Sequence, residues 1–335
     1  MQSRRDDEIE SLCIQKAHHL VSGRFQNPWH PHDHWNMIKE FLRWRVSPKP
    51  FKNEKKRIPY LPTEKPDFKA LEAKSCDYFI WLGHSTIYGR ISNVHFIMDP
   101  IFNGIFAGFH RYAPCPVRPE QLPSLEIILI THNHFDHMDL PSLKKLEALF
   151  SPVIIGGLGT AGYLHRNGLK KAIDMDWWEI SNISNIRIFC MPVQHWSRRR
   201  VFDADRLLWC GFILISDQTK AVLIGDSGYF RGFTEVGEKI GPFHIAFLPI
   251  GAYLPRRLMA PQHMSPDESI QTAIDLRAKI LIPIHWGTFD LSDEPIDEPP
   301  KTLLSVVNKN PPSLDSMKNQ KLEIFILKQG EPFFR

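Results

Sequence analysis

The feature that most constrains this chain is a cluster of metal-binding side chains in six residues, His132-Asn133-His134-Phe135-Asp136-His137. The apolar run Ile127-Ile128-Leu129-Ile130 comes shortly before it and predicts a buried strand. The cluster therefore stands where a strand ends and a loop begins, a frequent position for reactive side chains. A polar loop with surface histidines is the alternative, but the chain has only 16 histidines in 335 residues, so such a pattern rarely arises by chance.

The spacing of these residues indicates two metal ions. His132 and His134 alternate, so in an extended turn both imidazoles can point the same way and bind one ion. Asp136 and His137 follow and can turn toward a second ion. Imidazole and carboxylate ligands without a thiolate favour zinc, or a similar transition metal, in a catalytic rather than a structural site.

Composition narrows the class of protein. Hydrophobic residues make up 43% of the chain, enough for a large core, and the length fits one large α/β domain or two smaller ones. The net charge of +4 is too small to indicate a nucleic-acid binder, so no nucleic-acid partner is expected. The five cysteines are scattered without CxxC spacing, which predicts reduced thiols and a cytoplasmic location: Cys13, Cys76, Cys115, Cys190 and Cys210. Neither a signal peptide nor a bilayer-spanning run is visible, so any membrane contact is expected to be peripheral.

Residues 1–70 differ from the rest and are expected to form a basic, proline-punctuated N-terminal arm, with a catalytic domain over 71–335. Within the arm, Trp35, Ile38, Phe41 and Leu42 share one face of a short predicted amphipathic helix. Such a helix usually docks on a domain surface. With its tryptophan and basic residues it could instead lie at the interface of an anionic membrane.

Further polar residues follow apolar strands later in the chain. The runs 186–192, 221–224 and 280–284 are β-like, and His195, Asp226 and His285 come just after them. Strands are also expected at 77–82 and 94–98, paired as a hairpin, and at 322–327 near the end of the chain. Pro141 predicts the first turn of a helix, and Ser265 with Glu268 predicts a capping box at the start of another. His84, after the first of these, is as compatible with structural hydrogen bonding as with support of a metal ligand. Arg198, Arg199 and Arg200 form either a solvated turn or a phosphate-binding group.

The His-x-His-x-Asp-His motif after an apolar strand resembles the signature of metallo-β-lactamase-fold hydrolases. This resemblance implies an α/β (α+β) fold of the αββα four-layer sandwich type, here with an N-terminal extension. It also implies two zinc ions per chain. One would be held by His132, His134 and His195, the other by Asp136, His137 and His285, and Asp226 would bridge them, since a carboxylate has two oxygens.

Flanking segments are similar to the N-acylphosphatidylethanolamine-hydrolysing phospholipase D family: Asn27-Pro28-Trp29, Asp176-Trp177-Trp178-Glu179, Gln194-His195-Trp196, Gly225-Asp226-Ser227-Gly228-Tyr229, Pro249-Ile250-Gly251-Ala252-Tyr253, Gln262-His263 and His285-Trp286-Gly287-Thr288-Phe289. The similarity implies a zinc-dependent phosphodiesterase that uses a metal-activated hydroxide to release N-acylethanolamine and phosphatidic acid. Asp136, Asp226 and His263 would be catalytic, and the substrate would contact Gln194, Tyr253, Gln262 and His263. A phospholipid partner is expected, and a homodimer is compatible with the family.

Two other functions stay open at the level of sequence. The first is another binuclear metal hydrolase of the same fold, acting on a soluble phosphodiester, a nucleic acid or a lactone, since a fold does not select a substrate. The second is a binding protein without catalysis. The complete set of candidate ligands argues against the second, because binding alone would not require it.

Overall fold

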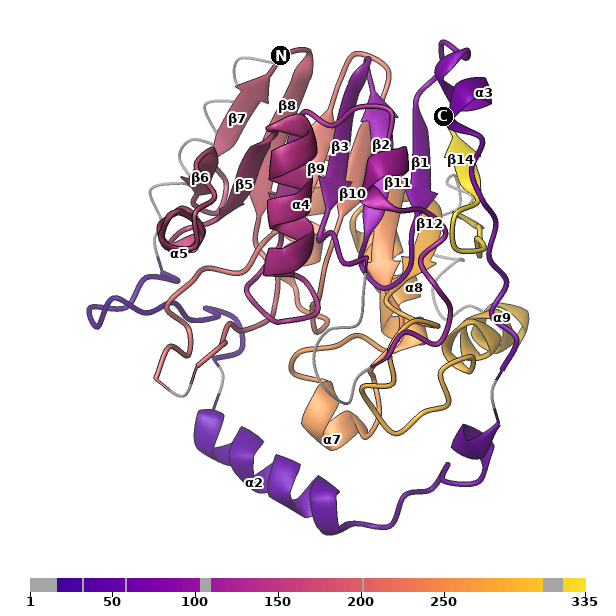
Figure 1. Cartoon of the computed structure of the whole chain (residues 1–335). Helices are drawn as coiled ribbons and strands as arrows, with labels where there is room; N and C mark the ends of the chain where they lie inside the picture. The colour runs from indigo at the N-terminus through magenta and orange to yellow at the C-terminus, as the bar shows by residue number, and fades with distance from the viewer. Residues whose placement is uncertain (1–16, 32, 58, 103–109, 201, 310–321) are drawn as a thin grey trace.

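Two seven-stranded sheets pack face to face in the centre of the molecule (Figure 1). The computed structural model describes residues 17–31, 33–57, 59–102, 110–200, 202–309 and 322–335. The first sheet has the order β14 (Pro332–Phe334), β1 (Tyr78–Trp81), β2 (Ile87–Ile91), β3 (Val94–Met98), β4 (Ile127–Ile130), β5 (Val153–Gly157) and β6 (Ala172–Met175). The second has the order β13 (Glu323–Ile324), β12 (Ala278–Ile284), β11 (Phe243–Pro249), β10 (Lys220–Leu223), β9 (Gly211–Ile215), β8 (Ile186–Met191) and β7 (Ile180–Ile183).

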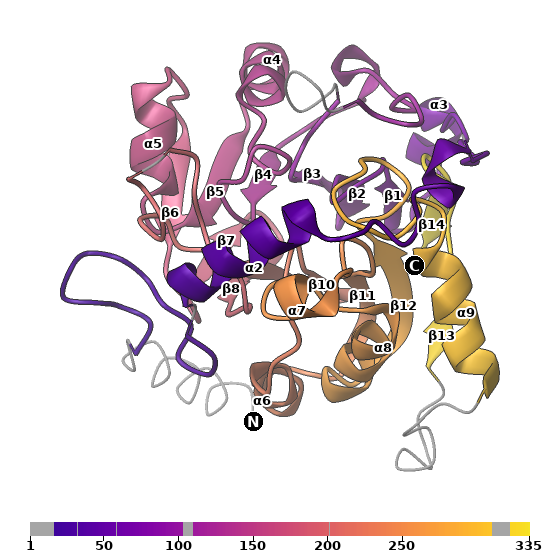
Figure 2. The same cartoon turned by 90° about the horizontal axis from the view of Figure 1, so that it is seen from below.

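Helices cover the outer faces of both sheets, which confirms the predicted αββα sandwich (Figure 2). On the first sheet lie α3 (Phe68–Glu72), α4 (Leu140–Phe150) and α5 (Thr160–Arg166). On the second lie α6 (Gly232–Lys239), α8 (Pro266–Asp275) and α9 (Pro299–Lys309). At one end of the sandwich are α2 (His34–Val46) and α7 (Arg256–Met259) (Figures 1 and 2). The short 3₁₀ helices are η1 (Glu54–Lys56) and η2 (Pro119–Gln121).

Alternation along the strands builds two hydrophobic layers. In β4, Ile127 and Leu129 belong to the core between the sheets, whereas Ile128 and Ile130 belong to the core under α4 and α5. Successive side chains of a strand point to opposite faces. A strand covered on both faces therefore reads as a continuous apolar run, as the sequence of β4 does.

The predicted hairpin between 77–82 and 94–98 is wrong, because β2 lies between β1 and β3 and pairs with both. The sequence of β2 does not read as a strand, since Gly89 and Arg90 interrupt its apolar pattern. Tertiary contacts account for both residues. A Cβ at Gly89 would lie 2.8 Å from the Tyr78 carbonyl oxygen, and the buried Arg90 Nη1 lies 3.1 Å from Glu72 Oε2.

The predicted helix starts are confirmed, whereas the predicted C-terminal strand is longer than the observed one. The helix α4 carries Pro141 in its first turn, and Ser265 with Glu268 caps α8, as expected. The strand expected over 322–327 is shorter, because only Glu323–Ile324 pairs with β12. The chain then adds β14 to the opposite sheet, beside β1.

The strand directions bring the predicted ligands to one end of the sandwich. Parallel pairing joins β3 to β4 in one sheet and β10 to β11 to β12 in the other. The carboxyl ends of parallel strands meet at the same edge. Loops from both sheets therefore converge at this end, next to α7.

Candidate metal centre

The loop after β4 is a tight turn that presents the central motif. The amides of His137 and Met138 both donate to the His134 carbonyl, at 3.2 and 2.9 Å. Asp139 then caps α4 by accepting a hydrogen bond from the Ser142 amide. The guanidinium of Arg199 supports the turn, donating to the Asn133 and Met138 carbonyls at 3.0 and 2.7 Å. Arg199 therefore fits neither of the two interpretations of the arginine run, because its side chain stabilises this loop.

One group of four side chains gathers at the ends of β4, β8 and β10. His134 Nδ1 lies 2.8 Å from His132 Nε2 and 3.2 Å from His195 Nε2. Asp226 Oδ2 completes the group, 3.8 Å from His195 Nε2. Their donor atoms converge on one point, as the sequence predicted for the first metal ion.

A second group shares Asp226 with the first. His285 Nε2 lies 2.9 Å from Asp226 Oδ1, and His137 Nε2 lies 3.3 Å from Asp226 Oδ2. Asp136 Oδ2 is 3.7 Å from the same His137 nitrogen. The structure thus brings all seven predicted ligands together, with Asp226 between the two groups; their binding of metal stays a prediction.

The residues of this centre fit divalent cations. Three buried atoms that face the centre lie close to one another but make no geometrically satisfied hydrogen bond within the described residues: His137 Nε2, His285 Nε2 and Asp226 Oδ1. Buried polar atoms are nearly always paired, so these require an explanation, and a bound cation supplies one. All candidate donors are nitrogen or oxygen atoms, which suits zinc and other first-row metals.

The electrostatics of the first group, His132, His134, His195 and Asp226, favour the ligand forms of its side chains. Burial lowers the pKa of His134 to about 4 and also lowers the pKa values of His132 and His195. These imidazoles are therefore neutral near pH 7, the form that binds a metal. Burial raises the pKa of Asp226, but His285 and His137 outweigh it and lower the pKa overall, so this carboxylate is ionised.

Asp99 is a functional residue that the sequence analysis did not identify. Its buried carboxylate lies 2.8 Å from His137 Nδ1 and accepts hydrogen bonds from the Thr131 amide and hydroxyl, at 2.8 and 2.6 Å. A carboxylate on the far nitrogen of a metal-binding imidazole fixes its tautomer and orientation. The sequence could have indicated this role, because Asp99 comes directly after β3, and β3 pairs with β4, the strand that precedes the ligand motif.

His84 supports a ligand. Its Nε2 lies 3.0 Å from Asp136 Oδ2, and its ring lies 4.1 Å from that of His285. Burial and the nearby His285 lower the pKa of His84 to about 3, so it is neutral and donates one hydrogen bond to the carboxylate. This placement favours the supporting role among the two that the sequence left open.

Asn27 ties the N-terminal arm to the centre. This fully buried residue donates from Nδ2 to the His195 carbonyl at 2.8 Å and accepts from Trp209 Nε1 at 2.9 Å. On the other side, His195 Nδ1 lies 3.0 Å from the Gln262 carbonyl. The sequence marked Asn27 only as part of a family-like segment. Its contact with His195 spans 168 positions, and no local pattern reveals it.

A cavity of about 270 Å³ opens directly over the two ligand groups. Its lining combines His134, Asp136 and Asp226 with Gln262, His263 and the apolar Phe135, Trp196, Ala252, Met259 and Leu291. The predicted substrate residues Gln262 and His263 thus face the centre. Gln194 and Tyr253 are not in this lining: Gln194 Nε2 donates to the His30 carbonyl at 2.8 Å, and the Tyr253 hydroxyl to Glu298 at 2.7 Å. Their contact with substrate stays a prediction.

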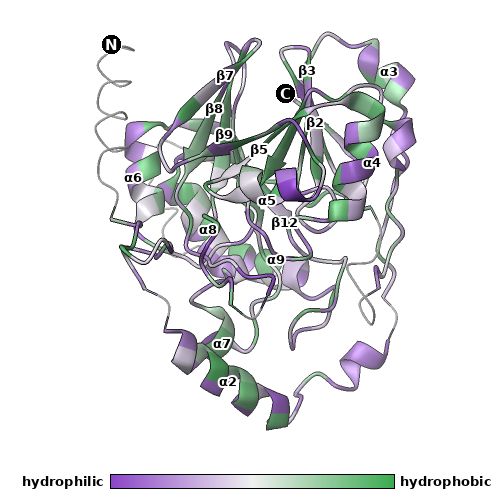
Figure 3. Cartoon of the chain, turned by 60° about the vertical axis from the view of Figure 1, so that its left-hand side comes forward, coloured by the Kyte–Doolittle hydropathy of each residue, from purple (hydrophilic) through white to green (hydrophobic). Residues whose placement is uncertain are grey.

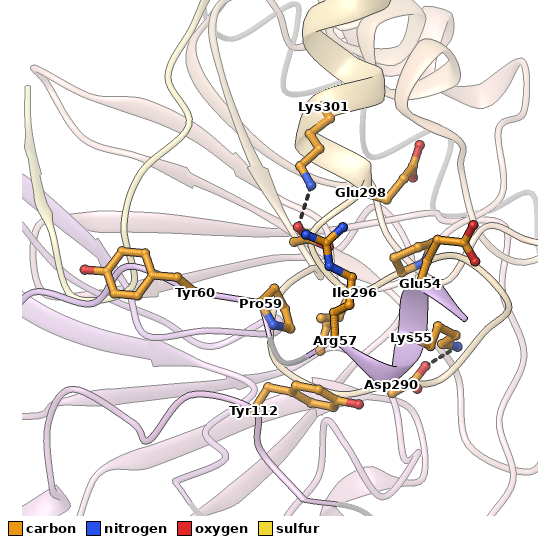
Figure 4. Close-up of a pocket in the computed structure, with 12 residues that line it drawn as sticks. Glu54, Lys55, Arg57, Pro59, Tyr60, Tyr112, Asp290, Ile296, Glu298 and Lys301 are labelled. Atoms are coloured by element: carbon orange, nitrogen blue, oxygen red, sulfur yellow. Dashed lines mark hydrogen bonds and ion pairs between the residues drawn. The ribbon is translucent and has the colours of Figure 1, made fainter. Parts of the chain in front are cut away.

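A different cavity, of about 400 Å³, lies between η1 and the segment before α9 (Figure 4). It contains neither a histidine nor any candidate ligand. Lys55 and Lys301 there pair with Asp290 and Asp297, each at 2.5 Å. Since none of the predicted metal ligands lines this cavity, the reaction centre is assigned to the smaller cavity beside Asp226.

Comparison with known proteins agrees with this geometry. Residues 95–286 match the family described as "Beta-lactamase superfamily domain". The chain is 34% identical over 228 residues to N-acyl-phosphatidylethanolamine-hydrolyzing phospholipase D 1 of Caenorhabditis elegans, covering 63% of this chain and 64% of the relative. It is 33% identical over 244 residues to a mitochondrial enzyme of the same name from Saccharomyces cerevisiae, covering 69% of this chain and 52% of the relative. The matches thus span less than two thirds of these relatives.

A solved structure supports the fold. A metallo hydrolase from Ignicoccus hospitalis superposes with a TM-score of 0.58 at 18% identity, covering 78% of this chain and 99% of the other.

Proposed function

The chain belongs to the β-lactamase superfamily, and we propose that it is a metal-dependent hydrolase of N-acylphosphatidylethanolamine. Water would cleave the P–O bond on the ethanolamine side, giving N-acylethanolamine, which takes the proton, and phosphatidate. The observation that carries the proposal is that Asp226 contacts ligands of both groups, His195 on one side and His137 and His285 on the other, beneath one cavity. The similarity to two phospholipases of this specificity supports the choice of substrate.

We propose two zinc ions as the metals, held by the two groups that meet at Asp226. Bound there, they would supply an activated water and positive charge opposite the phosphoryl oxygens. The chain's own residues prepare the site: Asp99 orients His137, His84 orients Asp136, and the Gln262 carbonyl orients His195. His263 reaches the cavity with Nδ1 3.8 Å from Asp226 Oδ2 and can hydrogen-bond the phosphate or the leaving oxygen.

The walls of the cavity favour a lipid over a polar soluble substrate. Phe135, Trp196, Met259 and Leu291 line it beside the ligand groups. Apolar walls with a few converging polar groups are typical of sites for largely apolar ligands. The phosphodiester would then lie at Asp226, with the hydrocarbon parts of the substrate along these side chains.

We further propose that α2 contacts an anionic membrane. None of its residues is buried, and Trp35, Leu42 and Val46 are 75%, 59% and 85% exposed. Figure 3 shows that α2 carries both hydrophobic and hydrophilic positions. A cavity of about 650 Å³ beside α2 is lined by Phe41, Trp44 and the basic residues Arg45, Lys49, Lys52, Lys55 and Lys56, together with Asp290 and Asp293, which pair with Lys55 and Lys49. Leu291 lines both this cavity and the one over the metal centre. Exposed apolar and basic side chains together suit a surface of anionic lipid, next to the entrance for a lipid substrate.

Of the helices in the described part of the chain, none has both the length and the apolar character needed to cross a bilayer.

The test combines metal analysis with a lipid assay. Bound metals are identified and counted per chain, and product release from N-acylphosphatidylethanolamine is followed in mixed micelles for the wild type and Asp226→Asn. We expect two zinc ions and phosphatidate from the wild type, and a loss of at least about 100-fold in the variant, because the bridging oxygen is replaced by an amide. Metal-loaded protein that leaves this lipid intact would overturn the proposed substrate, and a set of soluble phosphodiesters and lactones would then be assayed.

A further inference from the structure

A second set of potential ligands lies away from the reaction centre, where the N-terminal arm meets β6. His18 Nε2 lies 2.6 Å from Asp176 Oδ1, and His19 Nε2 lies 2.8 Å from Asp176 Oδ2. With one ligand atom taken from each of the three residues, these atoms all lie within 4.8 Å of one another. Asp176 directly follows β6, about 160 positions from the two histidines, so folding alone brings this set together.

We propose that His18, His19 and Asp176 form a separate binding site for a first-row transition metal ion such as zinc. The arrangement of the rings carries this proposal. The His18 and His19 rings are 4.5 Å apart with an interplanar angle of 77°. At the reaction centre the corresponding values are 4.5 Å and 84° for His132 and His134. At both places two nearly perpendicular imidazoles thus each bring one ring nitrogen within 4.8 Å of a shared carboxylate oxygen.

The donor set has the chemistry that such an ion requires. Two imidazoles and one carboxylate are a frequent ligand set for zinc and for non-haem iron. Burial raises the pKa of Asp176, but the hydrogen bond and charge of His18 outweigh it and lower the pKa to about 2, so the carboxylate is ionised. The side chains of His18 and Asp176 are 4% exposed, whereas that of His19 is 31% exposed. Solvent can therefore reach the site and provide a fourth ligand.

The contact distances are compatible with a bound ion. Ligand atoms at about 2.0–2.1 Å from a tetrahedral zinc ion stand roughly 3.3 Å apart, so each imidazole would move outward by roughly 0.5 Å. The reaction centre requires the same adjustment: His132 Nε2 lies 2.8 Å from His134 Nδ1, and His285 Nε2 lies 2.9 Å from Asp226 Oδ1. Contacts between ligand atoms are therefore equally short at the proposed site and at the reaction centre.

A metal ion here would fasten the arm to the first sheet. The His18 ring already stacks on Trp177, with ring centroids 4.3 Å apart. Nine positions further along the arm, Asn27 holds the His195 carbonyl. The proposed site therefore anchors the segment that reaches the reaction centre, and the proposal does not depend on which substrate that centre hydrolyses.

The test counts metal ions at equilibrium. Full-length wild type, His19→Gln and Asp176→Asn are dialysed against buffered micromolar free zinc, and bound zinc per chain is measured by mass spectrometry. Both variants keep polar groups that can hydrogen-bond but lose a strong metal ligand. We expect each to bind one zinc ion fewer than the wild type. Thermal melting in zinc and in chelator should show a larger zinc-dependent rise in melting temperature for the wild type than for either variant, because the variants keep only the ions of the reaction centre.

His30→Gln is the matched control, because it removes an exposed histidine from the same arm that is in no ligand group among the described residues. It should bind as many ions as the wild type. Equal counts in the wild type, His19→Gln and Asp176→Asn would overturn the proposal and leave the two histidines as hydrogen-bond donors to Asp176. A variant that fails to fold would lose more than one ion and a cooperative melt, so it is recognised from the same measurements.

Discussion

Asp99 provides a test of the reaction centre at the scale of a single residue. In Asp99→Asn, the contact with His137 Nδ1 changes from a carboxylate to an amide, and the orientation of that imidazole weakens. We expect metal affinity or activity to fall about 10- to 100-fold, the usual effect of losing such a partner. Competition with a chelator measures the affinity. Asp217→Asn, an exposed residue after β9, is the control and should bind metal as the wild type does.

His263 provides a second test, through pH. Burial lowers the pKa of His263 to about 4, so its imidazole is neutral near pH 7 and becomes charged only as the pH falls through that value. We expect His263→Gln to lower kcat about 100-fold with unchanged metal content, because His263 is proposed to hydrogen-bond the phosphate or the leaving oxygen and is not one of the seven predicted ligands. Any part of the acid limb that His263 contributes should lie near pH 4. A limb near pH 6.5 that disappears in the variant would contradict its neutral state.

At the scale of elements, the arm acts on the metal centre through Asn27. In Asn27→Ala, the buried His195 carbonyl loses a donor, while Trp209 Nε1 keeps a second acceptor, the Val193 carbonyl at 3.1 Å. An unpaired buried carbonyl costs about 1–3 kcal/mol. We expect a lower free energy of unfolding by about that amount and weaker binding of one ion.

Gln26→Ala is the control for this change, because the Gln26 side chain donates to the Ala17 carbonyl at an exposed position, away from His195. Denaturant unfolding and chelator competition on both variants separate the two effects. Unchanged metal affinity in Asn27→Ala would show that Asn27 supports the fold without positioning His195.

The start of α2 is held by a pair that depends on pH. The hydrogen bond to Asp205 raises the pKa of His34 above 6.5, outweighing the effect of burial, and their side-chain atoms lie 2.5 Å apart. A raised pKa means that this stabilisation is complete below about pH 6.5 and is lost as the pH rises through the higher folded value. We expect hydrogen exchange of the α2 amides, corrected for intrinsic rates, to be faster at pH 8.5 than at pH 6. In His34→Gln this difference should vanish; if it persists, another group is responsible.

At the scale of the whole molecule, α2 forms a surface that the sandwich does not cover. Figures 1 and 2 place it across the end of the sandwich beside α7, where the Arg257 side chain pairs with Glu40. We expect Trp35→Ser with Leu42→Ser to reduce binding to vesicles containing anionic lipid at least about 10-fold, since each removes exposed apolar area. Cosedimentation measures binding, and Asn36→Ser on the same helix is the control. Equal binding by the double variant and the wild type would rule out α2 as the membrane surface.

The sequence by itself determined which side chains were candidate ligands, and its motifs indicated the class of fold. Each of His195, Asp226 and His285 follows an apolar run, and apolar runs predict buried strands whatever surrounds them. Capping chemistry is equally local, so the starts of α4 and α8 were readable from Pro141 and from Ser265 with Glu268. Signals of this kind depend on neighbours within a few positions, which the sequence displays directly.

Only the tertiary structure decided the rest. The strand β2 contains Gly89 and Arg90, which fit because of Tyr78, Phe96 and Glu72 in other elements. Asp99, Asn27 and the set of His18, His19 and Asp176 acquire their contacts across the fold, at separations of 38 to 168 positions. The exposure of α2 likewise follows from which surfaces the sandwich leaves uncovered. Side chains that complete a site through long-range hydrogen bonds leave no periodic trace in the sequence, because what selects them is a partner brought near by folding.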